Sequence, residues 1–138
     1  MAEQHDRLIV QCRDWLRFAE RDLWSARQLL APPDGVCSTA AYLAQQAAEK
    51  SLKAYLTFRA VDFPFTHNIA VLRELCSGHG RWAELIAPAD ELTRYSTTAR
   101  YPSVGAEPDR AEAERCIAIA VTVHEAVTKA LADEGVSV

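Results

Sequence analysis

Apolar residues recur every three or four positions along most of this chain, which is the spacing of one face of an α-helix. The pattern predicts helices over residues 5–30, 38–59, 68–76, 81–100 and 108–132. No stretch alternates between apolar and polar residues for long enough to predict a β-strand. We therefore predict an all-α fold in a single domain, 1–138, built as an antiparallel up-and-down bundle of four long helices plus a short fifth.

Turn and capping residues mark the ends of these helices. The segment APPDG stops the first helix with two prolines and a glycine, and SGHG closes the short third helix. Ser38 or Thr39 is expected to cap the second helix, and Pro108 and Asp109 are expected to open the last one. Pro88 is the place where a break in the fourth helix is expected.

The second helix contains the stretch QQAAEKSLKAYLTF, in which polar and small residues alternate in blocks. At about 100° per residue, Gln46, Glu49, Lys50 and Lys53 fall on one side and the small and apolar residues on the other. This arrangement predicts a solvated polar face. Gln45 lies at the edge of the apolar arc instead, so we expect it to be a buried structural residue with hydrogen-bond partners.

Two ionisable residues interrupt the apolar stripes of other helices. Asp22 lies within the stripe of the first helix, and His124 lies within that of the last. A buried carboxylate must be paired, hydrogen-bonded or protonated, so we expect an arginine or a hydroxyl group to hold Asp22; a site acid is the alternative. His124 is expected to be a satisfied core residue, and the alternative is a base that Asp22 orients across the bundle.

Composition narrows the class of protein. The chain is 49% hydrophobic and 25% charged, as in ordinary globular proteins. Its start, MAEQHDR, has no hydrophobic signal core and no apolar run reaches the length of a membrane span, so we expect a cytoplasmic protein without a membrane partner. The net charge of −4 argues against a broad nucleic-acid footprint but allows a local positive pocket.

The four cysteines are far apart in sequence and lie at no metal-ligand spacing with each other or with histidine. We therefore predict four reduced thiols and neither a metal site nor a cofactor. Cys12 and Cys116 occupy apolar stripes, so both are expected to be small core residues.

The segment RYSTTARYP, residues 94–102, combines two Arg-Tyr pairs with three hydroxyl residues. Arginine suits phosphate and tyrosine can stack on a base, so this segment is a candidate site for a nucleotide or an RNA end. The alternative is a helix terminus, with arginine offsetting the carbonyl dipole and Tyr101 packing on the bundle. Arg94 is expected to point away from the apolar face, which leaves Arg100 as the stronger candidate.

Trp24 lies on the polar side of the first helix, and the apolar arc of the second helix is wide enough to face more than one neighbour. An exposed tryptophan is typical of an interface, so these two features indicate a homodimer. The alternative is that the N-terminal arm or a loop covers Trp24.

Four segments, in this order, resemble those of the HEPN domain, named for higher eukaryotes and prokaryotes nucleotide-binding. They read WLRFAERDLWSARQLL, AAYLAQQAAEKSLKAYL, FPFTHNIAVLREL and ELTRYSTTARYP. The resemblance implies a small helical bundle that dimerises. It also implies one of two functions: a metal-independent endoribonuclease with an arginine followed after four to six residues by a histidine, or a nucleotide-binding or partner subunit often encoded beside a minimal nucleotidyltransferase in toxin–antitoxin pairs.

This chain departs from the ribonuclease pattern. Neither Arg94 nor Arg100 is followed by a histidine at that spacing. Arg73 and His79 have the spacing, but about one such match is expected by chance, and the ribonuclease pair belongs to later helices. We therefore interpret the chain as a non-catalytic dimeric HEPN protein that binds a nucleotide or a nucleotidyltransferase partner.

In this interpretation Arg100 holds phosphate, Tyr101 or Tyr95 stacks or donates a hydrogen bond, and Lys50 and Lys53 can extend the positive patch. One alternative is an endoribonuclease that uses Arg100 with His124 as clamp and base. Another is a helical scaffold without a ligand, and RNA stays open as a binding partner.

Overall fold

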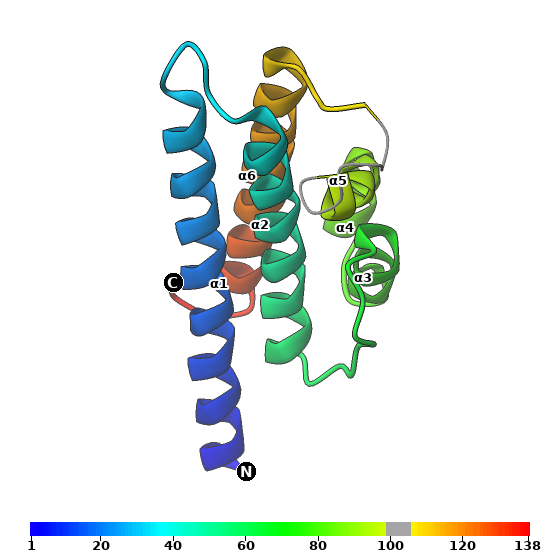
Figure 1. Cartoon of the computed structure of the whole chain (residues 1–138). Helices are drawn as coiled ribbons and strands as arrows, with labels where there is room; N and C mark the ends of the chain where they lie inside the picture. The colour runs from blue at the N-terminus through cyan, green and yellow to red at the C-terminus, as the bar shows by residue number, and fades with distance from the viewer. Residues whose placement is uncertain (99–105) are drawn as a thin grey trace.

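The computed structural model describes residues 1–98 and 106–138, and its successive long segments run in alternating directions (Figure 1). The elements in chain order are α1 (Ala2–Leu30), α2 (Cys37–Phe58), α3 (Ile69–Ser77), α4 (Trp82–Leu85), the 3₁₀ helix η1 (Ala87–Arg94), α5 (Tyr95–Thr98) and α6 (Arg110–Asp133). No strand occurs in the described residues. The predicted all-α fold is confirmed.

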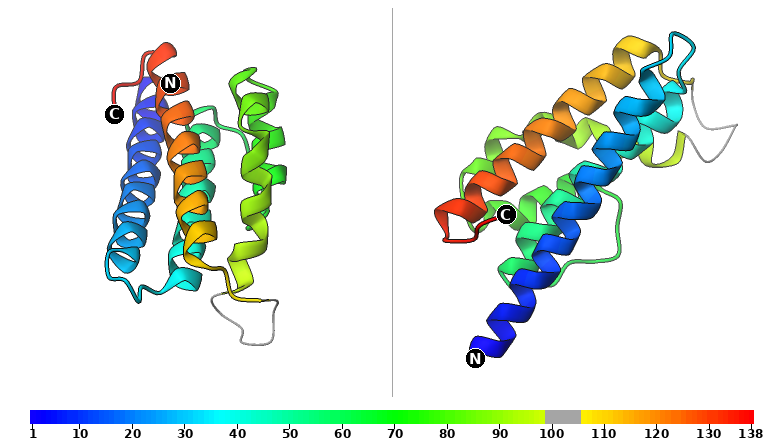
Figure 2. Two further views of the ribbon diagram at one scale, coloured as in Figure 1. Left: turned by 90° about the horizontal axis from the view of Figure 1, so that it is seen from above. Right: turned by 90° about the vertical axis from the view of Figure 1, so that its left-hand side faces the viewer.

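Helix α2 is the centre of the bundle, because it packs against α1, α6 and the α3 to α5 segment. In the left view of Figure 2, α1 lies on one side of α2 and the shorter helices on the other, while α6 lies in front of α2. Small side chains on α2 let these neighbours approach closely. The buried small residues of α2 are Ala40, Ala41, Ala44, Ala47, Ala48, Ser51 and Ala54.

The fourth predicted helix is broken, as expected. Its described part is divided into α4, η1 and α5 rather than forming one continuous helix. The division lies where the sequence predicted a break, since Pro88 stands at the start of the 3₁₀ segment. Proline has no N–H to donate and its ring clashes with the preceding turn, so it fits the first turn of a new helix better than the interior of an old one.

The helix starts agree only partly with the expected caps. Asp109 caps α6, where its side chain accepts a hydrogen bond of 2.8 Å from the backbone N–H of Glu112. The prediction for α2 is wrong, because the helix begins at Cys37 and its N-cap is Val36, not Ser38 or Thr39. No side chain caps α2 there.

The first turns of α1 extend beyond the end of α2 and leave the body of the bundle (Figures 1 and 2). All residues from Met1 to Arg7 are exposed. Further along α1, Arg13 holds the C-terminal residues, since its guanidinium donates two hydrogen bonds to the Ser137 carbonyl oxygen, at 3.0 and 2.7 Å. The N-terminal turns of α1 thus have surface available that the bundle itself does not use.

Candidate functional site

A polar hollow of about 320 Å³ lies where η1 and α5 meet the first turns of α6. Two exposed ion pairs span it: Arg115 Nη2 lies 3.0 Å from Glu91 Oε1, and Arg94 Nη2 lies 3.7 Å from Glu112 Oε2. The hollow is lined by Glu91, Arg94, Tyr95, Glu112, Arg115 and Cys116. It therefore places two guanidinium groups at the start of the segment predicted to recognise phosphate.

Tyr95 is the buried member of this hollow. Its hydroxyl lies 3.3 Å from Glu112 Oε2, and the Arg94 guanidinium lies over its ring, 4.9 Å from the centroid. Burial raises the pKa of Tyr95 to about 12, so the phenol is protonated at neutral pH and can donate a hydrogen bond. Because the ring is covered, the hydroxyl rather than a stacking face is what Tyr95 offers.

Beneath the same hollow, Cys116 is buried, as predicted for a core residue. Burial raises the pKa of its thiol to about 11. The thiol is therefore protonated at neutral pH and is not a nucleophile.

The two main sequence candidates, Arg100 and Tyr101, lie outside the described residues. Their predicted roles in holding a phosphate and a base stay predictions. The described helix α5 leads from the hollow directly into their segment. Arg94 has an exposed side chain, as expected.

The predicted solvated face of α2 is buried at two of its members, Glu49 and Lys53, and only half-exposed at the other two, Gln46 and Lys50. Glu49 is 3% exposed and Lys53 is 6% exposed. Lys53 Nζ lies 3.0 Å from Glu49 Oε2 and 5.6 Å from the ring centroids of both Trp15 and Phe63. The cause is that α1 and the connection after α2 bring aromatic rings over this side of the helix, which the angular position of Lys53 on its own helix cannot reveal.

A network of polar groups surrounds the Glu49 carboxylate. His67 Nδ1 lies 2.7 Å from Glu49 Oε1, and Gln45 Nε2 lies 3.3 Å from the same oxygen. Gln45 is fully buried, as predicted, and donates a hydrogen bond of 2.8 Å to the His67 carbonyl oxygen. We name Gln45, Gln46, Glu49, Lys53 and His67 the α2 polar cluster. It ties the connection after α2 back to the helix, so its role is structural.

Sequence reasoning missed His67, because its partner lies 18 positions earlier in the chain. Only the folded connection brings the two together. The FPFTHN segment marked the turn but not the pairing.

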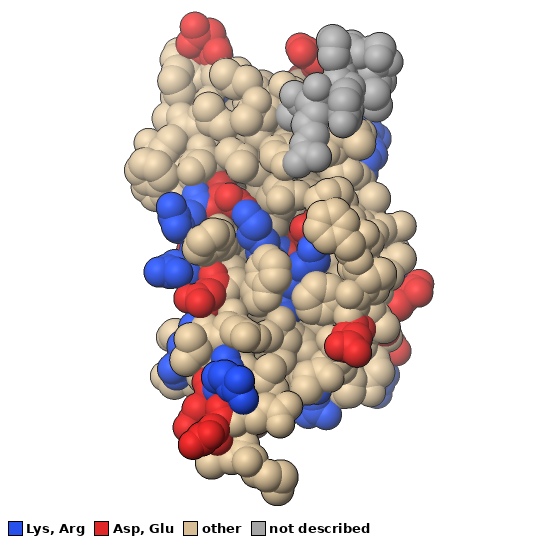
Figure 3. Space-filling view, turned by 60° about the horizontal axis from the view of Figure 1, so that its bottom comes forward, with Lys and Arg blue, Asp and Glu red and all other residues tan. Residues whose placement is uncertain are grey.

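Asp22 is paired, as expected, although its partner is a lysine rather than an arginine or a hydroxyl group. Lys50 Nζ lies 2.6 Å from Asp22 Oδ2, and both side chains are largely buried. Figure 3 shows one face of the molecule on which basic and acidic side chains lie next to one another among uncharged residues. Lys50 and Lys53 thus have acidic partners of their own, and neither lines the hollow at Tyr95.

The prediction that His124 is a satisfied core residue is wrong, because it is only half-buried and its Nε2 atom has no hydrogen-bond partner among the described residues. The Nε2 atom of His124 lies 3.3 Å from Glu20 Oε1, close enough for an ion pair when the imidazole is protonated but not aligned for a hydrogen bond. Asp22 therefore does not orient His124 within the described chain. The Arg100–His124 pair of the ribonuclease alternative stays a prediction, because Arg100 lies outside the described residues.

Arg73, which matches the ribonuclease spacing by chance, has a partner within the fold. Arg73 donates two hydrogen bonds to the Asp90 carboxylate, at 2.7 and 2.8 Å, which join α3 to η1. These hydrogen bonds raise the pKa of the Arg73 guanidinium. With its donors directed at Asp90, Arg73 is not presented to a substrate together with His79.

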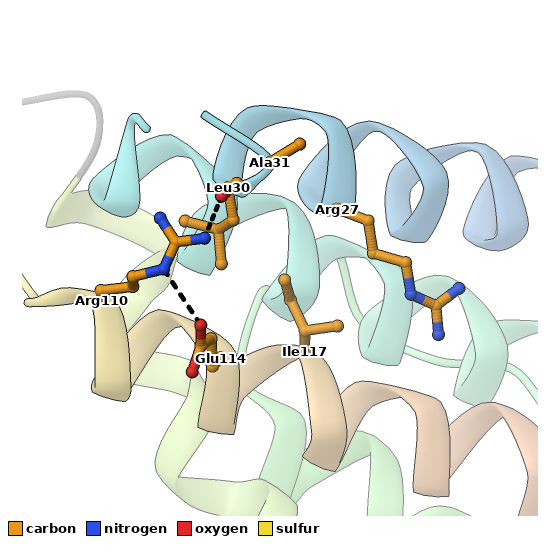
Figure 4. Close-up of a pocket in the computed structure, with 6 residues that line it drawn as sticks. All are labelled: Arg27, Leu30, Ala31, Arg110, Glu114 and Ile117. Carbon is orange, nitrogen blue, oxygen red and sulfur yellow. Dashed lines mark hydrogen bonds and ion pairs between the residues drawn. The ribbon is translucent and has the colours of Figure 1, made fainter. Parts of the chain in front are cut away.

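A second hollow, of about 260 Å³, lies between the end of α1 and the start of α6 (Figure 4). Arg110 crosses it and donates hydrogen bonds to the carbonyl oxygens of Leu30 and Pro32, while its Nε donates to Glu114 at 3.1 Å. Carbonyl groups at a helix end have no partner within the helix, so Arg110 caps α1 from the neighbouring element. We therefore assign this hollow to the fold and not to a ligand.

All four cysteines are free, and Cys12, Cys76 and Cys116 are buried. Across residues 1–98 and 106–138, no three His, Cys, Asp or Glu side chains are grouped closely enough to hold a metal ion. None of the helices that the structure describes has both the length and the apolar content needed to cross a membrane.

A comparison with protein families matches residues 12–131 of this chain to the HEPN domain. Among solved structures, that of ST0689, an archaeal HEPN homologue, is similar with a TM-score of 0.68 and 27% sequence identity, covering 88% of this chain and 98% of that one. That of TT1696 from Thermus thermophilus has a TM-score of 0.71 and 27% identity, over 86% of this chain and 97% of that one. No curated protein matches the chain.

Proposed function

Because the chain belongs to the HEPN domain family, we propose that it is a non-catalytic, homodimeric HEPN protein that binds a nucleotide and serves as partner subunit of a minimal nucleotidyltransferase, in a toxin–antitoxin pair. The RYSTTARYP segment lacks the histidine that the ribonuclease branch of the family places after its arginine. Trp24 is 65% exposed, which supports the homodimer.

The observation that carries the nucleotide proposal is the hollow at Tyr95. Its volume of about 320 Å³ suits a small ligand, since such sites measure roughly 300–1,000 Å³. Arg94 and Arg115 are both 66% exposed, and their exposed ion pairs are worth at most about 1 kcal/mol each. Phosphate can therefore compete with the glutamates for these guanidinium groups, because its hydrogen bonds to arginine are charge-assisted and often bidentate.

The remaining contacts of the bound nucleotide come from the segment that follows α5. Arg100 adds a third guanidinium for phosphate, and Tyr101 supplies a ring on which a base can stack. Tyr95 contributes its protonated hydroxyl, whose single O–H donates to Glu112 Oε2 in this structure and exchanges that partner for the nucleotide on binding.

Calorimetric titration of ATP into the purified protein tests this proposal. We expect saturable binding that weakens at least tenfold in Arg115→Ala and in Arg100→Ala. Arg81→Ala is the matched control, because Arg81 is an exposed arginine at the start of α4 that does not line the hollow, and the variant should bind as the unaltered protein does.

Circular dichroism of each variant confirms that the helices are retained. If Arg115→Ala and Arg100→Ala both bind ATP as tightly as the unaltered protein does, the nucleotide binds elsewhere. No heat with the unaltered protein would contradict nucleotide binding and favour a protein partner alone or a scaffold without a ligand.

A further inference from the structure

The N-terminal half of α1 carries a seam with coiled-coil spacing. Its positions follow one another in steps of four and three, the repeat by which one helix packs against another. Leu8 and Trp15 are half-buried and Phe18 is 44% exposed. Within the described chain, what reaches this side of α1 is the ammonium groups of Lys50 and Lys53, over the Phe18 and Trp15 rings, and the connection after α2, which leaves much of the seam uncovered. The seam consists of Gln4, Leu8, Gln11, Trp15 and Phe18.

Two hollows lie along this seam and share Gln11. One, of about 380 Å³, is lined by Gln11, Asp14, Trp15 and Phe18. The other, of about 430 Å³, lies between Gln4, Leu8 and Gln11 and the residues that follow α2. Together they form a furrow on both sides of Gln11, suited to receiving large side chains from a helix laid along it.

Charged residues on one flank of the seam change sign about Gln11. At about 100° per residue they fall within an arc of roughly 100°. Glu3 and Asp6 lie at the N-terminal end, and Arg17 and Arg21 lie at the C-terminal end. The two charges nearest to Gln11 have the opposite order, with the base Arg7 before it and the acid Asp14 after it. Reversing the helix about Gln11 therefore sets each charge near an opposite one, in the pairs Glu3 with Arg21, Asp6 with Arg17 and Arg7 with Asp14.

These charges have few partners within one copy. Among the residues that the structure describes, the only ion pair within this set joins Arg17 to Asp14, and both side chains are more than half exposed. Arg21 lies over the Phe18 ring, 5.0 Å from its centroid, at the edge of the furrow.

We propose that two copies of this chain dock through this seam, α1 against α1 in antiparallel orientation, with Gln11 of each copy at the two-fold axis. The inference rests on the homodimer of the proposed function and names its surface. In an antiparallel pair the same flank of each helix meets its counterpart, so the three charge pairs form twice. Leu8, Trp15 and Phe18 of one copy enter the furrow of the other, and the two Gln11 amides pair across the axis.

Charge reversal on each half of the seam tests the proposal. Sedimentation equilibrium should show a dimer for the unaltered chain and at least a tenfold higher dissociation constant for two variants, R17E with R21E, and E3R with D6R. Each variant places like charges against like charges in its own dimer. Mixing the two variants should restore a dimer of one copy of each, because every pair then joins opposite charges.

Leu85→Glu is the matched control, because Leu85 is a large apolar residue that is 82% exposed on another face and should not alter the dimer. Phe18→Glu should dissociate it. If all the α1 variants stay dimeric, this surface is wrong but the proposed homodimer stands. The same holds if Trp24→Arg is the one variant that dissociates the dimer. A mixture that stays monomeric would overturn the antiparallel arrangement, and a monomeric unaltered chain would contradict both the surface and the proposed homodimer.

A cross-link gives an independent measurement that does not depend on charge. Gln11→Cys should form a disulfide-linked dimer under mild oxidation, because the two positions meet at the axis, whereas the unaltered chain, with three of its four cysteines buried, should not. Absence of this cross-link in a dimeric variant would place the axis elsewhere. ATP binding, measured on the same samples, reports on the nucleotide proposal separately.

Discussion

Glu49 and Lys53 form the most buried ion pair of the described chain, with side chains 4% and 8% exposed. The carboxylate is satisfied by His67 and Gln45 as well as by Lys53. Lys53 has Glu49 and two aromatic rings around its ammonium group. Burying two charges costs desolvation energy, which such a pair offsets only when its hydrogen bonds are complete.

Replacing Glu49 alone should therefore lower the free energy of unfolding more than replacing Glu49 and Lys53 together. Glu49→Gln leaves the Lys53 charge buried without its partner and should lower the free energy of unfolding by about 3–5 kcal/mol. Glu49→Gln combined with Lys53→Met should cost less than Glu49→Gln alone, since no uncompensated charge remains. Urea denaturation of the two single variants and the double variant gives the coupling energy, and additive losses would contradict the dependence of each charge on the other.

At the scale of elements, the turn between α1 and α2 is held by close backbone contacts. The N–H of Val36 donates a hydrogen bond of 3.1 Å to the Leu29 carbonyl oxygen. A Cβ atom at Gly35 would lie 2.3 Å from that same oxygen. The φ angle of Gly35 is not in the left-handed region, so its backbone conformation does not require glycine. Glycine is required because the neighbouring backbone leaves no space for a Cβ atom.

Gly35→Ala should consequently destabilise the protein by about 1–3 kcal/mol, because the clash is with backbone that other contacts hold in place. Gly78→Ala is the control: its Cβ would meet only the Leu75 carbonyl oxygen at 3.6 Å, an ordinary contact, so the change should stay within about 0.5 kcal/mol. Thermal unfolding of both variants checks the difference, and equal melting temperatures would show that the turn can relax.

At the scale of the whole molecule, burial keeps several weak acids protonated. It raises the pKa of Tyr55 and Tyr95 to about 12, and that of Cys76 to about 12. In the unfolded chain these groups lose their protons near their ordinary values of 10 for tyrosine and 9 for cysteine. The folded state therefore holds more protons than the unfolded state between these pH values.

Below about pH 8 these groups should not change the free energy of unfolding. From about pH 9 to 12 the free energy of unfolding should fall as the pH rises. The fall should be about 1.4 kcal/mol per pH unit for each group that is ionised in the unfolded state but still protonated in the folded state. Tyr55→Phe should make the fall less steep above pH 10, since it removes one such proton. Urea denaturation at pH 7, 9, 10 and 11 measures the slopes. An unchanged slope in Tyr55→Phe would contradict the raised pKa of Tyr55.

Much of this fold could be predicted because its causes are local. Helical periodicity, the cap at Asp109 and the break at Pro88 depend on residues within a turn or two of each other. The same reasoning found that Gln45 is buried and that Asp22 needs a partner, because both lie beside apolar neighbours on their own helices.

The order of residues alone was enough to predict the all-α fold, the course of its helices and the need for partners at polar positions in the core. The partners themselves are known from the folded chain: Lys50 for Asp22, 28 positions away, and His67 for Glu49. Folding also buries Lys53 and assembles the hollow at Tyr95 from two distant elements. The physical reason is that desolvation depends on what covers a side chain from outside its own helix, and that covering segment is remote in sequence.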